Sequence, residues 1–140
     1  MSFNSSAAFK VLLFHMKFDL PVGGANLLFN ESGVTSEAFR FRVEFLKEEL
    51  QEFVDAARVG DRVKALDALV DLVYVALGTS LFMGVHAHQW DEAFDVVHQA
   101  NMTKIRTPRP DDSKRGSGFD VIKPEGFVPP EGLIRRILGE

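Results

Sequence analysis

The spacing of apolar residues along the first hundred positions is typical of helices. Apolar side chains recur loosely at intervals of three and four residues near the N-terminus, whereas residues 20–36 are interrupted by one proline and three glycines and form a predicted loop. Further periodic segments are bounded by capping residues and glycines. The pattern predicts four helices: residues 6–18, Thr35 or Ser36 to about Val59, Asp61 to about Met83, and residues 87–104.

Beyond residue 104 the helical pattern stops. Prolines and glycines recur too often for a long helix, and no run of residues indicates a strand, although a short closing helix fits residues 131–138. The sequence therefore predicts one all-α domain over residues 1–140. Its helical core covers residues 1–104, and an irregular C-terminal arm covers residues 105–140.

The segment ALDALVDLVYV at residues 65–75 is apolar on every side of the third helix except for Asp67 and Asp71. Residues 65–85 have the length of a membrane span, but two aspartates are costly in lipid, so the core of a soluble protein is the preferred interpretation. A helix that is apolar all round must be covered all round. Three other helices barely suffice for this, which predicts a homodimer or a dimer of dimers.

Acidic residues occupy unexpected positions on the second helix as well. Glu49 and Glu52 fall within the apolar stripe that Phe41 and Phe45 define, and Glu48 lies at its edge. Exposed glutamates on a helix are usually just solvated, and Glu-Glu-x-x-Glu is common by chance.

The third helix adds a second acidic pair, because Asp67 and Asp71 are four residues apart and share one face. Carboxylates that converge inside a protein repel one another unless a cation neutralises them. Oxygen ligands without cysteine favour Mg²⁺, with Mn²⁺ as a substitute.

The fourth helix places polar residues on its apolar face. Asn101 and Lys104 share that face with Trp90, Phe94 and Val97, so they are candidates to hold a phosphate or a sugar. A helix end that frays into solvent is the simpler alternative.

Composition narrows the class of protein. The chain has 140 residues, of which 46% are hydrophobic and 26% charged, and its net charge of −4 argues against a general nucleic-acid binder. The absence of cysteine excludes disulfides and thiolate metal sites, and it fits a cytoplasmic protein. No signal peptide is evident at the N-terminus.

The ordered series of these motifs resembles a known group of enzymes. Glu-Glu-x-x-Glu at 48–52, DALVDLVYVALG at 67–78, VHQANMTK at 97–104 and KPEGFVPPEGL at 123–133 are similar to the MazG-like and dimeric-dUTPase all-α nucleoside triphosphate pyrophosphohydrolases. One departure is Ala68, where the commoner pattern has a glutamate; here the acid is Asp67.

The resemblance implies Mg²⁺-dependent hydrolysis of a nucleoside or deoxynucleoside triphosphate between the α and β phosphates, giving the monophosphate and pyrophosphate. Two alternatives stay open: phosphoribosyl-ATP pyrophosphohydrolase, and a non-catalytic, metal-stabilised helical interaction module. The KPEGFVPP segment favours the MazG-like interpretation over the former. The implied roles are Glu49, Glu52, Asp71 and Asp67 as metal ligands, Glu48 as general base or outer ligand, and Asn101, Lys104, Lys123, Phe14 and His15 as substrate-binding residues.

Overall fold

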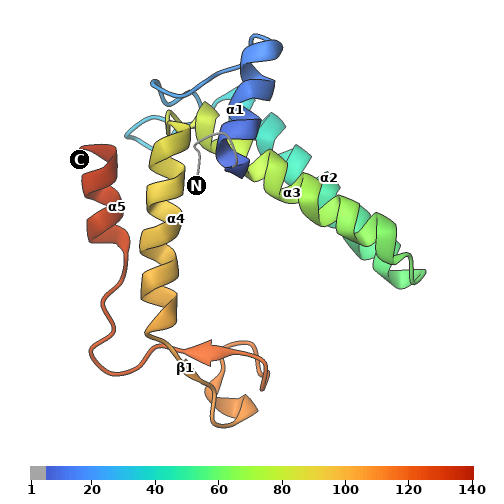
Figure 1. Ribbon diagram of the computed structural model, residues 1–140, viewed down its shortest axis with the longest axis vertical. Helices are drawn as coiled ribbons and strands as arrows, with labels where there is room; N and C mark the ends of the chain where they lie inside the picture. Colours follow the sequence, from blue (N-terminus) through green and yellow to red (C-terminus); the bar gives the residue numbers. More distant parts are fainter. Residues whose placement is uncertain (1–5) are drawn as a thin grey trace. The chain divides into compact units, whose positions relative to one another are not determined.

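The computed structural model describes residues 6–140 and divides into two compact units, Met1–Trp90 and Asp91–Glu140. The division falls inside the fourth helix, whereas the sequence placed the start of the arm at residue 105. The elements in chain order are α1 (Ala7–Lys17), α2 (Glu37–Arg58), α3 (Arg62–Phe82), α4 (Ala87–Met102), β1 (Ile105–Arg106), the 3₁₀ helix η2 (Pro110–Asp112), β2 (Val121–Ile122) and α5 (Glu131–Leu138) (Figure 1). The all-α prediction is confirmed.

Capping side chains start the three helices of the N-terminal unit. Ser6, Ser36 and Asp61 each accept a hydrogen bond from the backbone N–H three residues later, which satisfies one of the free donors of the first turn. Gly60 between α2 and α3 has φ +73°, a left-handed conformation that ends a helix at little cost for glycine. The predicted N-caps at Ser36 and Asp61 and the predicted helix end at Gly60 are therefore confirmed.

Helices α2 and α3 run antiparallel and lie side by side, and α1 packs on the C-terminal part of α3 (Figure 1). The buried cluster consists of Ala8 and Val11 of α1 with Leu77 and Leu81 of α3. Partly buried Leu12, Tyr74, Ala87 and Trp90 surround this cluster. The core thus lies around the second half of α3.

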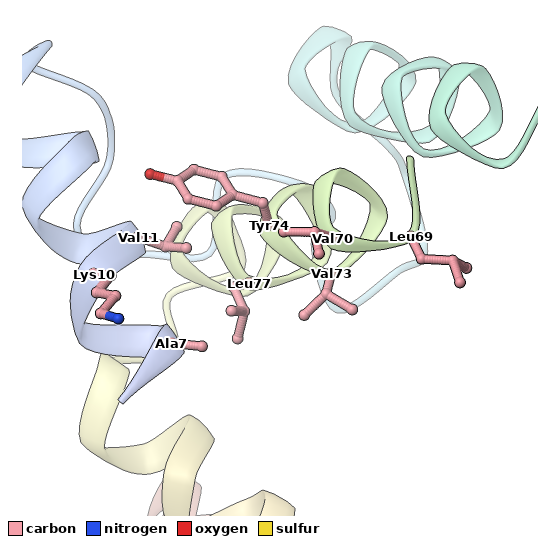
Figure 2. A pocket seen from close by; sticks show the side chains of 8 residues that line it. All are labelled: Ala7, Lys10, Val11, Leu69, Val70, Val73, Tyr74 and Leu77. Atoms are coloured by element: carbon pink, nitrogen blue, oxygen red, sulfur yellow. The ribbon is translucent and has the colours of Figure 1, made fainter. Parts of the chain in front are cut away.

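The first half of α3 is not covered within one chain. Val63, Leu66, Val70 and Val73 are 81%, 62%, 55% and 53% exposed, because α2 covers one side of this half and α1 reaches only the second half. An apolar cleft of about 480 Å³ lies between α1 and α3. Figure 2 shows the side chains that line it: Ala7, Lys10, Val11, Leu69, Val70, Val73, Tyr74 and Leu77. By length and composition alone α3 is also able to cross a membrane, a test that the core helix of a soluble protein passes equally well.

The C-terminal unit contains a short hairpin that the sequence did not predict. β1 and β2 pair antiparallel, with Ile105 opposite Ile122 and Arg106 opposite Val121. Strands of two residues are too short to produce a period-two pattern, which explains the missed prediction. The closing helix at 131–138 is confirmed as α5.

Candidate acidic site between α2 and α3

The acids of α2 differ sharply in burial. Glu49 is only 7% exposed, whereas Glu48 and Glu52 on either side are exposed. Burial raises the pKa of Glu49 above its usual range, and the charges of Glu52, Asp71 and Glu48, in that order, together with a hydrogen bond to Glu52, raise it further. Carboxylates of both helices are thus close enough to Glu49 to act on its charge.

The α3 side of the site is formed by Asp71, which is half-buried, and Asp67, which is exposed one turn earlier. A surface cleft of about 520 Å³ brings Asp67 together with Glu52 across the two helices. The remaining lining residues of this cleft are Asp55, Ala56, Val59 and Lys64. The five acids predicted from the sequence therefore share one edge of the α2–α3 pair, although Glu52 projects outward rather than into the core.

The donor chemistry of this edge fits a hard divalent cation. The Oε2 atom of Glu49 is buried without a hydrogen-bond partner in the part of the chain that is described, a costly state for a carboxylate oxygen. Within residues 6–140, no three acidic or histidine side chains are already positioned to hold an ion. Because Glu48, Glu52 and Asp67 are exposed, their carboxylates are free to turn toward Glu49 when a cation binds.

A buried arginine on α2 was missed by sequence reasoning, which placed Phe41 in the core instead. Arg42 is 5% exposed and Phe41 is 56% exposed. The guanidinium donates from Nη2 to the carbonyl oxygen of Val75 at 2.7 Å and from Nε to Oγ1 of Thr79 at 3.1 Å. Arg42 lies seven residues before Glu49, so both residues share one face of α2. This spacing was the sequence signal that could have identified Arg42 as an inward-facing residue. Arg42 joins α2 to α3 two turns away from the acids.

The predicted base-pocket residues on α1 occupy different environments. Phe14 is 41% exposed and meets Tyr74 edge-on, with ring centroids 5.4 Å apart. His15 is 2% exposed, and its Nδ1 donates to the carbonyl oxygen of Pro21. Burial lowers the pKa of His15, and the nearby Arg42 charge adds to this, while the hydrogen bond to Pro21 opposes it. His15 is thus a core residue rather than a wall of an open pocket.

The C-terminal unit holds the predicted phosphate-binding residues. No residue of α4 is buried, and Phe94 is 62% exposed, so the predicted inward face of this helix is not seen in a single chain. Asn101 is exposed and Lys104 is half-buried. The Nζ atoms of Lys104 and Lys123 lie 5.8 and 5.2 Å from the centroid of the Phe127 ring.

Comparison with known families decides the class of protein. Residues 27–101, more than half of the chain, match the family described as phosphoribosyl-ATP pyrophosphohydrolase. The chain belongs to this family. No curated protein matches the sequence.

Membership of the phosphoribosyl-ATP pyrophosphohydrolase family makes the chain a hydrolase that acts on phosphoric anhydrides, with a nucleotide as substrate. The family is part of the MazG-like all-α superfamily, so the resemblance seen in the sequence is supported at that level. The match spans the acids of α2 and α3 and ends at Asn101, whereas Phe14, His15, Lys104 and Lys123 lie outside it.

Proposed function

We propose that the protein hydrolyses the α–β phosphoanhydride bond of a nucleoside or deoxynucleoside triphosphate in the presence of Mg²⁺, releasing pyrophosphate. The observation that carries this proposal is Glu49, a buried carboxyl whose pKa is raised by burial and by Glu52, Asp71 and Glu48 around it. Such a cluster is unfavourable by itself and becomes favourable when a cation neutralises it.

Glu49, Glu52 and Asp71 are the residues expected to hold Mg²⁺, with Asp67 beside Glu52 in the cleft. Mn²⁺ offers the same preference for oxygen ligands. When bound, the ion neutralises phosphate oxygens and makes a bound water a better nucleophile. The free Oε2 atom of Glu49 supports this assignment.

Glu48 is the expected general base. It is exposed and adjacent to Glu49, so its carboxylate is accessible to a water molecule and able to accept that water's proton. Asn101 and Lys104 are expected to contact the sugar and the phosphates.

The family match favours phosphoribosyl-ATP as a second candidate substrate. Both candidates lose pyrophosphate from a nucleotide, so the same acidic site serves either. They differ in the group attached to the base.

The test measures pyrophosphate release from a panel of nucleoside triphosphates, deoxynucleoside triphosphates and phosphoribosyl-ATP, with Mg²⁺ and with a chelator. Mutation of a residue that only supports a metal ligand typically lowers metal affinity or activity by about 10- to 100-fold. Glu49 and Asp71 are expected to be ligands themselves, so Glu49→Gln or Asp71→Asn should lower kcat by at least about 100-fold. Glu44→Gln is the matched control, since Glu44 is an exposed acid of α2 that pairs with Lys47. Full turnover in Glu49→Gln and Asp71→Asn would overturn the metal assignment.

A further inference from the structure

Two aromatic rings lie on the surface of α2, in the turns that precede the acids. Phe41 is 56% exposed and Phe45 is half-buried, and their ring centroids are 5.8 Å apart. Both rings line a surface cleft of about 310 Å³, together with Glu44 and Glu48. Neighbouring apolar side chains that stay in contact with water are typical of a surface that binds a ligand or a partner.

The aromatic cleft adjoins the acidic site along a single helix. Residues spaced three or four apart form one row on the surface of α2: Phe41, Phe45, Glu48 and Glu52. At a rise of about 1.5 Å per residue, Glu49 lies about 6 Å along the helix axis from Phe45 and about 12 Å from Phe41. A nucleotide carries its base and its α phosphate on opposite sides of one ribose. Rings at this spacing therefore match the base of a nucleotide whose phosphates lie at the acids.

A buried cation holds both rings from the core side. The guanidinium carbon of Arg42 lies 5.7 Å from the ring centroid of Phe41 and 5.4 Å from that of Phe45. Arg42 is itself fixed by its hydrogen bonds to Val75 and Thr79. The attraction between a cation and an aromatic ring limits the motion of the rings. Side chains that are ordered before a ligand arrives lose less entropy when it binds.

The walls of the cleft favour a small planar ligand over a second copy of the chain. Its volume of about 310 Å³ falls at the lower end of the range of small-molecule sites, about 300–1,000 Å³. Its polar walls are carboxylates, Glu48 and Glu44, the latter paired with Lys47 at 3.2 Å. The centres of protein–protein interfaces are instead depleted of charged residues.

We infer that Phe41 and Phe45 form a platform on which the nucleobase of the substrate stacks. This inference rests on the proposed function, since it names the part of the same substrate that α2 holds beside the acids. It also assigns the base to α2 rather than to α1, where His15 is enclosed in the core. Every nucleobase has a π-face, so stacking contributes affinity for the base of any nucleotide.

The test compares a nucleoside triphosphate with ribose 5-triphosphate, which has the same α–β bond but no base. Phe41→Leu keeps an apolar side chain and removes the ring, so it should lower kcat/KM for the nucleotide by at least about 5-fold. The loss should come from a higher KM, because stacking is equal in the ground and transition states. For ribose 5-triphosphate, kcat/KM should stay as in wild type. Phe41→Tyr restores a ring and should behave as wild type with both substrates.

Phe119→Ala is the control for removal of an exposed ring. Phe119 is 98% exposed in the turn before β2, and its loss should change kcat/KM for neither substrate. Equal losses for both substrates in Phe41→Leu, or no loss for either, would overturn the inference. A lower molecular mass of Phe41→Leu in light scattering would also overturn it, since the rings would then belong to a contact between subunits.

Failure of the platform and failure of the proposed function give different results, because binding of a product is measurable without turnover. Calorimetry with the four common ribonucleoside monophosphates should show binding to wild type that Phe41→Leu weakens by at least about 5-fold. If Glu49→Gln keeps turnover while Phe41→Leu weakens this binding, the platform stands and the metal assignment falls. If Glu49→Gln loses turnover while Phe41→Leu binds the monophosphates as wild type does, only the platform is wrong. A wild type that binds none of the four also contradicts the platform.

Discussion

Single residues in this protein show how burial and neighbouring charges shape the acidic site between α2 and α3. Glu49 is enclosed between α2 and α3, next to three other carboxylates, in a position where water cannot compensate its charge. An enzyme that uses such a group gains a strong cation site and gives up stability in the absence of the cation.

The raised pKa of Glu49 predicts how the metal-free protein responds to pH. The folded state holds this proton more tightly than the unfolded chain does, so the stability that protonation contributes is present in acid and is lost as the pH rises through the raised pKa. The affected window begins near the ordinary glutamate pKa of about 4.3 and extends upward. In a chelator, the melting temperature of Glu49→Gln should decline less than that of wild type across this window and be higher at neutral pH.

His15 contributes in the opposite sense, because burial lowers its pKa and its neutral form is the folded one. Both proteins contain His15, so its contribution cancels when the melting temperatures of Glu49→Gln and wild type are compared at the same pH. If the melting temperatures of Glu49→Gln and wild type changed with pH by the same amount, this result would contradict a raised pKa at Glu49. Added Mg²⁺ should raise the melting temperature of wild type much more than that of the variant.

Arg42 is a second residue whose effect can be predicted from its surroundings. It is a buried cation that forms no ion pair within residues 6–140, and its guanidinium carbon lies 4.9 Å from the Phe82 ring centroid. Arg42→Ala removes this packing and should cost about 2–4 kcal/mol in the free energy of unfolding. Arg42→Met keeps the volume without the buried charge, and it should cost less than about 1 kcal/mol.

The hydroxyl of Thr79 also donates to the carbonyl oxygen of Val75, so this acceptor stays satisfied in both Arg42 variants. Urea unfolding of the two variants measures the difference. If Arg42→Ala and Arg42→Met lose the same free energy of unfolding, the hydrogen bonds of the guanidinium contribute more to stability than its packing does.

At the scale of helices, the sequence predicted what is local and missed what depends on a neighbour. Ser36 and Asp61 mark helix starts because a cap is formed by the helix's own first turn. The buried face of α2 is set by where α3 lies, and it follows Arg42, Glu49 and Ala56 rather than the predicted stripe through Phe41 and Glu52. The inward position of Glu49 was predicted correctly because both stripes include it.

The contact between α1, α2 and α3 depends on the absence of a side chain at Gly78. A Cβ atom there would lie 2.8 Å from Nη2 of Arg42 and 2.8 Å from Nε2 of His15. Neither neighbour can move freely, since Arg42 is bound to Val75 and Thr79, and His15 to Pro21. Gly78→Ala should therefore lose about 1–3 kcal/mol of stability even though alanine favours a helix.

Gly132 provides the matched control for Gly78. It lies in α5, and a Cβ atom at this position would have nothing within 4 Å. Gly132→Ala should leave the stability unchanged or raise it by up to about 1 kcal/mol through helix propensity. If Gly78→Ala and Gly132→Ala change the free energy of unfolding by the same amount, His15 and Arg42 do not pack closely against Gly78 of α3.

At the scale of the whole molecule, the exposed half of α3 is the feature that one chain leaves unexplained. The side chains of Val63, Leu66, Val70 and Val73 are more than half exposed on a helix whose other end forms the core. The apolar cleft of about 480 Å³ next to them, lined by α1 and α3, continues this surface (Figure 2). Contiguous apolar surface of this kind is typical of protein–protein interfaces.

We propose that a second copy of the chain covers this surface, as the apolar pattern of α3 predicted. Light scattering at low micromolar concentration should report at least a dimer. Val70→Glu places a charge in the middle of the surface, and because burying an unpaired carboxylate costs several kcal/mol, it should shift the protein to monomer. Val34→Glu is the control, since Val34 is 63% exposed in the loop before α2 and its charge should leave the assembly unchanged. A wild-type protein that is monomeric and fully active would show instead that the enzyme tolerates an uncovered α3. The acidic site, whose Asp67 borders this surface beside Leu66 and Val70, would then be complete within one chain.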